Sequence, residues 1–130
     1  MLLSKFRWKK YITLGKNSWA AYLERGDIST TDASVLLVHG FSCSASDFVG
    51  LLRTLPENYH VVAVDLLNHS DSSAITDRDV TIEDMAKFLK KVLPIFLLKI
   101  SRSFNFLPLH LKHLYTTINC CFFSLLRKLV

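Results

Sequence analysis

The sequence predicts a single α/β domain whose central sheet contains parallel strands. Residues 35–38 (Val-Leu-Leu-Val) and 61–64 (Val-Val-Ala-Val) are uninterrupted apolar runs bounded by polar, turn-forming residues, a pattern typical of strands buried on both faces. Between them, residues 48–55 carry apolar side chains at positions i, i+3, i+4 and i+7, which is one face of a helix. A strand, a helix and a strand in this order predict a βαβ unit with parallel strands and a right-handed crossover.

An antiparallel hairpin is expected before this unit. Residues 11–14 and 18–23 have the residue pattern of β-strands, and they lie on either side of Gly15-Lys-Asn. Glycine and asparagine tolerate the positive φ that a tight turn requires. The sheet is therefore predicted to open with two antiparallel strands.

Capping signals set the expected limits of two helices. The first is predicted over residues 46–55, with Ser46 as its N-cap and Pro56 at its end. The second is predicted over residues 82–93, where Thr81 can cap the first turn. Pro94 is expected to end it, because proline removes one helical hydrogen bond and crowds the preceding turn.

The composition divides the chain near residue 94. Its 130 residues bound it at one small domain, and with 50% hydrophobic and 21% charged residues it is not disordered by composition. Residues 1–84 hold 8 Lys+Arg against 11 Asp+Glu, whereas residues 85–130 hold 8 against none. No glycine follows Gly50. We therefore assign residues 1–93 to the domain and residues 94–130 to a divergent, basic and apolar tail.

Targeting signals and cysteine usage favour an intracellular chain, cytoplasmic or membrane-associated. The first ten residues hold no apolar stretch of the kind found in a secretory signal. The longest uncharged run of the tail, residues 113–126, falls short of the roughly 20 residues that span a bilayer. Cys43, Cys120 and Cys121 have neither a zinc spacing nor a disulfide pattern, so all three are expected to be reduced thiols.

The most informative stretch is residues 35–48, Val-Leu-Leu-Val-His-Gly-Phe-Ser-Cys-Ser-Ala-Ser-Asp-Phe, followed by His-Val-Val-Ala-Val-Asp at 60–65 and Asn-His-Ser-Asp-Ser at 68–72. A strand, His-Gly-Phe, a helix, a strand and an aspartate in this order resemble the α/β-hydrolase family, and most of all its monoacylglycerol-lipase-like branch. The resemblance covers about residues 11–92. It implies the N-terminal part of a doubly wound, mostly parallel sheet.

This resemblance implies part of an oxyanion hole at the end of the first buried strand. In the family the residue after His-Gly supplies a backbone N–H to the hole, which here is Phe41, and His39 and Gly40 shape the loop. Acyl transfer builds a negative oxygen in its transition state, which a fixed donor stabilises. The implied family activity is serine-hydrolase cleavage of acylglycerol-type esters, with a lipid or other ester as substrate and no cofactor.

Two departures from the family pattern bear on activity. After the second strand the family often reads Asp-x-Pro-Gly-His-Gly-x-Ser, of which this chain keeps only Asp65, His69 and Ser72. The nucleophile elbow, G-x-S-x-G, needs glycines for its strained turn, and none follows Gly50. No acid follows Asp84 either. We therefore assign no catalytic nucleophile, acid or histidine, and expect a truncated and inactive chain.

The histidine at the end of the first buried strand has two interpretations. One is that His39 is a base for Ser42, Cys43 or Ser44, with Asp65 orienting its ring. The favoured one is that His39 supports the oxyanion loop by hydrogen bonding while the serines cap a helix. The sequence therefore predicts a structural role for this histidine.

No metal site is expected, because no cluster of Asp, Glu and His has ligand spacing. His60 and His69 are expected to be surface or loop histidines.

The tail has alternative interpretations. It contains basic residues among Leu and Phe, namely Lys99, Arg102, Lys112, Arg127 and Lys128. Such a segment can lie on an anionic membrane, which gives a non-catalytic membrane-surface or interaction protein as the alternative function. Nucleic-acid binding is not expected, since no basic face or known binding module is visible. The favoured interpretation is a divergent terminus, such as an alternative splice end.

Overall fold

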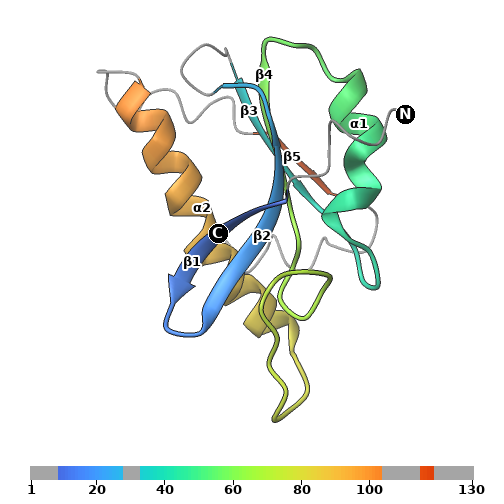
Figure 1. Ribbon diagram of the computed structural model, residues 1–130, viewed down its shortest axis with the longest axis vertical. Coiled ribbons are helices and arrows are strands. Elements are labelled where there is room, and N and C mark those ends of the chain that lie inside the picture. Colours follow the sequence, from blue (N-terminus) through green and yellow to red (C-terminus); the bar gives the residue numbers. More distant parts are fainter. Residues whose placement is uncertain (1–8, 28–32, 104–114, 119–130) are drawn as a thin grey trace.

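The structure, a computed structural model, describes residues 9–27, 33–103 and 115–118, which form a mixed sheet with helices on both faces (Figure 1). The sheet has five strands in the order β1-β2-β4-β3-β5. They are β1 (Lys10–Gly15), β2 (Ser18–Arg25), β3 (Ala33–Val38), β4 (Tyr59–Val64) and β5 (Tyr115–Ile118). The helical segments are the 3-10 helix η2 (Ala45–Phe48), α1 (Val49–Thr54) and α2 (Ile82–Ser103).

Strand pairing follows the predicted topology over its first four strands. β1 and β2 form an antiparallel hairpin, and β2 also pairs antiparallel with β4. β3 and β4 are parallel, with Ser34 opposite His60 and Val38 opposite Val64. Asn17 in the hairpin turn has a φ of 56°, a value that asparagine tolerates better than most residues. The expected hairpin and βαβ unit are confirmed.

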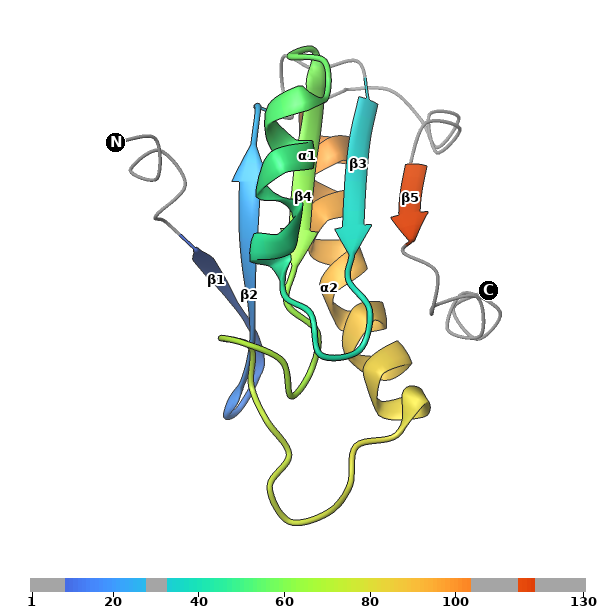
Figure 2. The same ribbon diagram turned by 90° about the vertical axis from the view of Figure 1, so that its right-hand side faces the viewer.

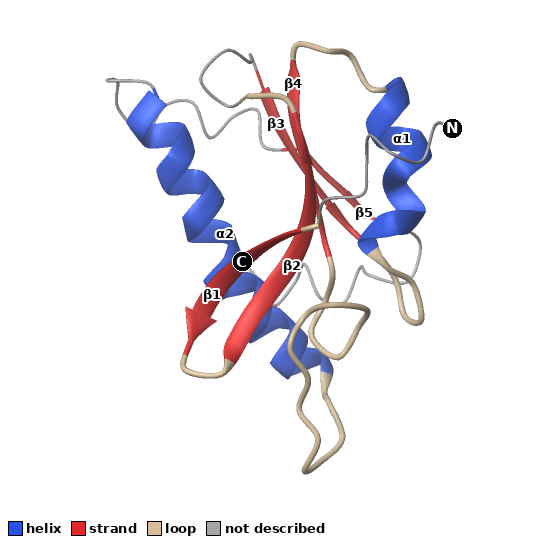
Figure 3. Ribbon diagram, viewed as in Figure 1, coloured by secondary structure: helices blue, strands red, loops and turns tan. Residues whose placement is uncertain are grey.

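Side-chain alternation along the strands builds two apolar layers, one on each face of the sheet. One layer packs under α2, and it joins Leu36, Val38, Val62 and Val64 to helix residues such as Leu89. The other packs under η2 and α1, and its members are Leu23, Val35, Leu37, Ala45, Leu52, Val61 and Ala63. The helices therefore lie on opposite faces (Figures 2 and 3). Two-sided burial explains why the strands at 35–38 and 61–64 are apolar throughout.

The helices differ in detail from their predicted limits. The first helical segment begins one residue before Ser46, at Ala45, and Ser44 precedes it as the N-cap. The Asp47 carboxylate accepts a hydrogen bond from the Ser44 N–H at 2.7 Å, so the capping pair lies two residues earlier in the chain than expected. At the start of α2, the predicted cap is confirmed, because the Thr81 hydroxyl accepts the Asp84 N–H at 3.2 Å.

The expected end of the second helix at Pro94 is wrong, because α2 continues through this proline to Ser103. Val92 and Phe96 on either side of it are buried, and the Phe96 ring stacks edge-on against Tyr22 with centroids 5.2 Å apart. Pro94 has no N–H to donate to the backbone carbonyl of Lys90, but Lys90 is exposed, so water can hydrate that carbonyl. The packing of Val92 and Phe96 offsets the lost hydrogen bond.

Residues 115–118 from the predicted tail add a fifth strand, which was not expected. β5 pairs in parallel with β3, with Val35 opposite Tyr115 and Val38 opposite Ile118. Lys112, Arg127 and Lys128 lie outside the described residues, as do Cys120 and Cys121. Within the described ranges, no helix combines the length and the hydropathy needed to cross a membrane. The division of the chain at residue 94 stays a prediction.

A buried polar network lies where β2, β3 and β4 meet, at the amino ends of the parallel strands. His60 is only 1% exposed, which corrects the expectation of a surface or loop histidine. Its Nε2 lies 2.7 Å from the Glu24 carboxylate, and its Nδ1 lies 3.2 Å from the Ser34 hydroxyl. Lys10 pairs with the other Glu24 oxygen at 2.6 Å. Burial is tolerated because both ring nitrogens have partners.

This network predicts an acid-dependent loss of stability. The hydrogen bond to His60 and the nearby Lys10 outweigh burial and lower the pKa of Glu24 from its ordinary 4.5 to about 2. The folded state therefore favours the carboxylate, so the contribution is complete above pH 4.5 and is lost as the pH falls toward 2. Glu24→Gln should lower the free energy of unfolding by about 2 kcal/mol at pH 7 and by progressively less below pH 4.5.

Urea unfolding between pH 7 and pH 3 measures this difference, and Glu57→Gln on the exposed loop before β4 is the control. A Glu24→Gln variant that loses stability with acid as steeply as the wild type would contradict the assignment.

Candidate functional site

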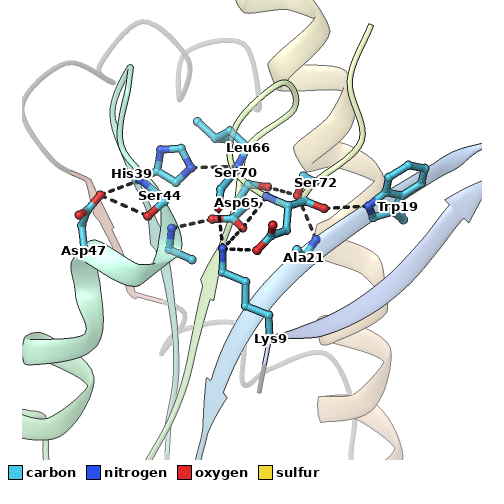
Figure 4. Close-up of polar contacts among 12 residues, drawn as sticks. Lys9, Trp19, Ala21, His39, Ser44, Asp47, Asp65, Leu66, Ser70 and Ser72 are labelled. Carbon is cyan, nitrogen blue, oxygen red and sulfur yellow. Dashed lines mark hydrogen bonds and ion pairs between the residues drawn. The ribbon is translucent and has the colours of Figure 1, made fainter. Parts of the chain in front are cut away.

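The sequence-predicted site residues meet at the carboxyl ends of β3 and β4. The loop after β3 (residues 39–44) and the loop after β4 (residues 65–73) lie side by side there, next to the start of β2 (Figure 4). Parallel strands bring their carboxyl ends to one edge of a sheet, which is where ligands bind in open α/β folds. The two loops are joined by hydrogen bonds from two histidines.

His39 connects the end of β3 to the end of β4. Its Nε2 accepts the Leu66 N–H at 3.0 Å, so its Nδ1 carries the proton and donates to the Gly40 carbonyl at 2.8 Å. The ring is 1% exposed, and burial lowers the pKa of His39 below its ordinary 6.5, although the hydrogen bond to Gly40 opposes this effect. His39 is therefore neutral at pH 7, and both of its nitrogens bond the backbone.

These contacts bear on the alternative in which His39 acts as a base for the nearby serines or Cys43. No ring nitrogen of His39 is free to accept a proton from a hydroxyl or thiol. Asp65, the proposed orienting acid, binds the Ala45 N–H at 2.7 Å instead. The geometry therefore favours the supporting role.

His69 makes the second connection, from the other loop. Its Nε2 accepts the Ser42 N–H at 3.3 Å, and its Nδ1 donates to the Leu67 carbonyl at 2.9 Å. The His69 ring lies 5.0 Å from that of His39, centroid to centroid. Ser42 has a φ of 61°, a left-handed conformation that costs an L-residue free energy. The hydrogen bond to His69 helps to hold that strained residue in place.

Phe41 lies in the loop after β3, between His39 and the Ser42 N–H that bonds His69. Its side chain is 79% exposed and packs edge-on against His69, with ring centroids 5.9 Å apart. Cys43 closes the turn beneath it, since its N–H donates to the Gly40 carbonyl at 3.2 Å. Among the described residues, the Phe41 N–H has no hydrogen-bond acceptor. Within the part of the chain that the structure describes, the loop thus presents an unpaired backbone donor at Phe41, close to residues whose own positions are fixed.

Asp65 and Ser72, which match the family pattern, hold the second loop against the sheet. The Asp65 carboxylate is fully buried. The Ser72 hydroxyl donates to the Asp65 carbonyl at 2.6 Å and accepts the Ala21 N–H at 2.9 Å, which ties the loop to β2 (Figure 4). Across the described ranges, no group of three Asp, Glu, His or Cys side chains is placed to hold a metal ion.

The loop after β4 keeps an unusual backbone course. Asn68 and Ser70 have φ values of 60° and 47°, and they stand where the family pattern has its two glycines. The Asn68 side chain compensates by bonding Ile75, accepting its N–H at 2.6 Å and donating to its carbonyl at 3.0 Å. A serine in this conformation costs about 1–2 kcal/mol relative to an ordinary φ.

Backbone strain at Ser70 predicts that glycine is more stabilising than alanine at this position, the reverse of the order expected in a helix. Both Ser70→Gly and Ser70→Ala lose the hydroxyl, but only alanine keeps the strained φ, so the glycine variant should be more stable by about 1 kcal/mol. At Ser46, which is exposed in η2, alanine should be the more stable by about 0.5–1 kcal/mol. Urea unfolding of all four variants measures both differences. Greater stability of alanine at both positions would contradict a left-handed Ser70.

Comparisons with known proteins agree with this geometry. Residues 33–99 match the family described as alpha/beta hydrolase fold. Monoacylglycerol lipase abhd6-B of Xenopus laevis is 36% identical over 64 residues, which are 49% of this chain and 18% of the relative. Monoacylglycerol lipase ABHD6 of Homo sapiens is 32% identical over 54 residues, 42% of this chain and 16% of the relative. The chain thus matches less than a fifth of the length of these relatives.

Solved structures show the same fold. The 2-hydroxy-6-oxo-6-phenylhexa-2,4-dienoate hydrolase of Rhodococcus sp. strain RHA1 superimposes with a TM-score of 0.64 at 21% identity, over 95% of this chain and 41% of that one. A membrane phospholipase A gives 0.59 at 24% identity, over 86% of this chain and 31% of that one. With the family match covering half of its residues, the chain belongs to the α/β-hydrolase fold family, and it is related to lipases within it.

Proposed function

We propose that the loops after β3 and β4 form the oxyanion-binding part of a serine hydrolase that cleaves acylglycerol-type esters. The observation that carries this proposal is the N–H of Phe41, which has no partner among the described residues and lies on a loop that His39 and His69 hold from two sides. A donor fixed before the reaction stabilises a developing negative oxygen without reorganisation of the site.

Two exposed aromatic side chains, one on each of two segments at this end of the sheet, suit an apolar ester. Phe41 is 79% exposed and Trp19, at the start of β2, is 42% exposed. The Trp19 indole donates to the Asp71 carbonyl at 2.8 Å, so its ring lies against the loop after β4. Relatives named monoacylglycerol lipase support the same substrate class. We therefore expect a lipid ester to be recognised here through its carbonyl and its acyl chain.

The nucleophile is the part of such a site that these 130 residues do not supply. β5 lies beside β3, and the residues after it contain no glycine. A G-x-S-x-G elbow is therefore absent from this stretch of the chain. Ser42, Cys43 and Ser44 are the nearest candidates in the sequence. Of the histidines that the structure describes near them, His39 and His69 use both ring nitrogens to bond the backbone.

The first expected outcome is a lack of turnover by these residues alone. The 130-residue chain should hydrolyse short p-nitrophenyl esters no faster than a variant in which Ser42, Cys43 and Ser44 are all alanine, because a nucleophile without a base is weak. Initial rates from absorbance of the released phenolate measure this. Turnover that Ser42→Ala alone abolishes would contradict it and indicate a local nucleophile.

The second expected outcome is binding of a tetrahedral anion at Phe41. A long-chain alkylphosphonate monoester carries the charge and shape of the intermediate in ester cleavage, so it should shift the amide NMR signal of Phe41 on titration. Phe41→Ala keeps the backbone N–H, whereas Phe41→Pro removes it. A hydrogen bond to a charged group contributes about 1.5–3 kcal/mol, so proline should weaken binding at least tenfold relative to alanine.

Circular dichroism of both variants serves as the check on folding in that experiment. Equal affinity of the alanine and proline variants for the phosphonate would overturn the assignment of the Phe41 N–H as an oxyanion donor.

A further inference from the structure

A lysine outside the family pattern reaches the centre of the site. Lys9, immediately before β1, extends its ammonium group to three acceptors (Figure 4). These are the Asp65 carboxylate at 2.6 Å, the Asp71 carboxylate at 2.8 Å and the Ser70 hydroxyl at 2.7 Å. An ammonium group has three N–H donors, and each one is used. The Lys9 side chain is only 15% exposed, so this is an inward-directed contact.

The Asp65 carboxylate needs a cation because it is fully buried. A buried carboxylate without a countercharge loses several kcal/mol of hydration that nothing replaces. Among the described residues, Lys9 is the cation that forms an ion pair with it. Burial opposes the charge of the lysine, but the hydrogen bonds to Asp65 and Asp71 outweigh this and raise the pKa of Lys9 above its ordinary 10.5. The ammonium group of Lys9 is therefore charged at neutral pH.

One oxygen of this carboxylate acts on the loop that carries Phe41. Asp65 Oδ1 accepts the N–H of Ala45 at 2.7 Å, and Ala45 is the first residue of η2, directly after residues 39–44. Ala45 is itself fully buried, so its position fixes where the loop ends. A shift or protonation of Asp65 would weaken this bond and free that end of the loop.

The other contacts of Lys9 act on the loop after β4. Asp65 Oδ2, which Lys9 binds, also accepts the Asp71 N–H at 3.3 Å. Lys9 bonds Ser70 directly, and Ser70 is the residue after His69, whose ring accepts the Ser42 N–H. One ammonium group therefore contacts Asp65, which binds the end of the loop after β3, and Ser70, which lies next to His69 in the loop after β4.

We propose that Lys9 is a positioning residue for the candidate oxyanion site, holding the loop after β3 through Asp65 and the loop after β4 through Ser70 and Asp71. This inference rests on the proposed function for the oxyanion-binding role of the loop. The positioning itself does not depend on that role, because the contacts of Lys9 are present without an ester. Lys9 is not a catalytic residue, since it acts through Asp65.

Cys43 provides a reporter inside the loop. It is a free, half-buried cysteine, so opening of the loop should expose its thiol further and speed its alkylation by iodoacetamide. Mass spectrometry of the peptide that contains Cys43 separates its reaction from those of Cys120 and Cys121. In Lys9→Met the rate at Cys43 should rise at least tenfold, and Lys9→Arg should restore most of the protection.

Lys10→Met is the matched control. Lys10 is the next residue and also forms an ion pair at 2.6 Å, but with Glu24 in the network at the opposite end of the parallel strands. Lys10→Met should leave the alkylation rate at Cys43 within about twofold of the wild type, because the contacts of Lys10 lie away from both loops of the candidate site.

A double variant keeps the test decisive if Lys9→Met fails to fold. Lys9→Met with Asp65→Asn removes both charges, and the asparagine carbonyl can still accept the Ala45 N–H. This variant should fold and protect Cys43 better than Lys9→Met alone.

Three outcomes would overturn the proposal, namely an unchanged rate in Lys9→Met, an equal rise in Lys10→Met, and no rescue by the double variant. None of them involves phosphonate binding at Phe41, so failure of this inference and failure of the proposed function are told apart.

Discussion

A buried negative charge at the end of β4 determines how the site is assembled. The Asp65 carboxylate has no access to solvent, so each of its oxygens must be satisfied by protein donors. Those donors come from three distant parts of the chain, Lys9 before β1, Ala45 at the start of η2, and Asp71 in the loop after β4. A residue of opposite charge and two backbone N–H groups can meet only if the hairpin, β3 and β4 are all in register. The cost of burying the charge thereby selects one arrangement of the loops.

Much of the fold could be predicted from the sequence, because its strongest signals come from burial. The apolar runs at 35–38 and 61–64 have to be buried on both faces, which requires helices on both sides of a parallel pair, and the structure has them. The end of α2 could not be predicted in this way. A proline signal is local, whereas the packing of Phe96 on Tyr22, 74 positions earlier in the sequence, is not visible to any local pattern. The fifth strand was missed because the tail lacks the periodicity on which such predictions depend.

In the candidate site too, local sequence patterns could be predicted, whereas roles that depend on distant contacts could not. The family pattern places His39, Gly40 and Phe41 at the end of a strand, and in the structure His39 bonds the backbone of Leu66 and Gly40. Their role in an oxyanion hole stays a prediction. Lys9 and His60 could not be found, since each acquires its role only through partners 56 and 36 residues away. The loop after β4 lacks two glycines of the family pattern, yet Asn68 and Ser70 keep a left-handed backbone. Tertiary contacts there outweigh the local preference of each residue, at a cost in strain.

The two imidazoles of the site perform a task that few other side chains can. Each ring accepts a backbone N–H on one nitrogen and donates to a backbone carbonyl from the other. A single ring therefore connects the loop after β3 to the loop after β4. A protonated imidazole has no acceptor, and protonation of His39 or His69 would therefore break the bond to Leu66 or to Ser42. Burial disfavours the charged form of His39, and this preserves the connection that also carries Phe41. The desolvation of that ring thus contributes to the loop's geometry, because it keeps the imidazole neutral, while the Gly40 carbonyl and the Leu66 N–H determine which nitrogen carries the proton.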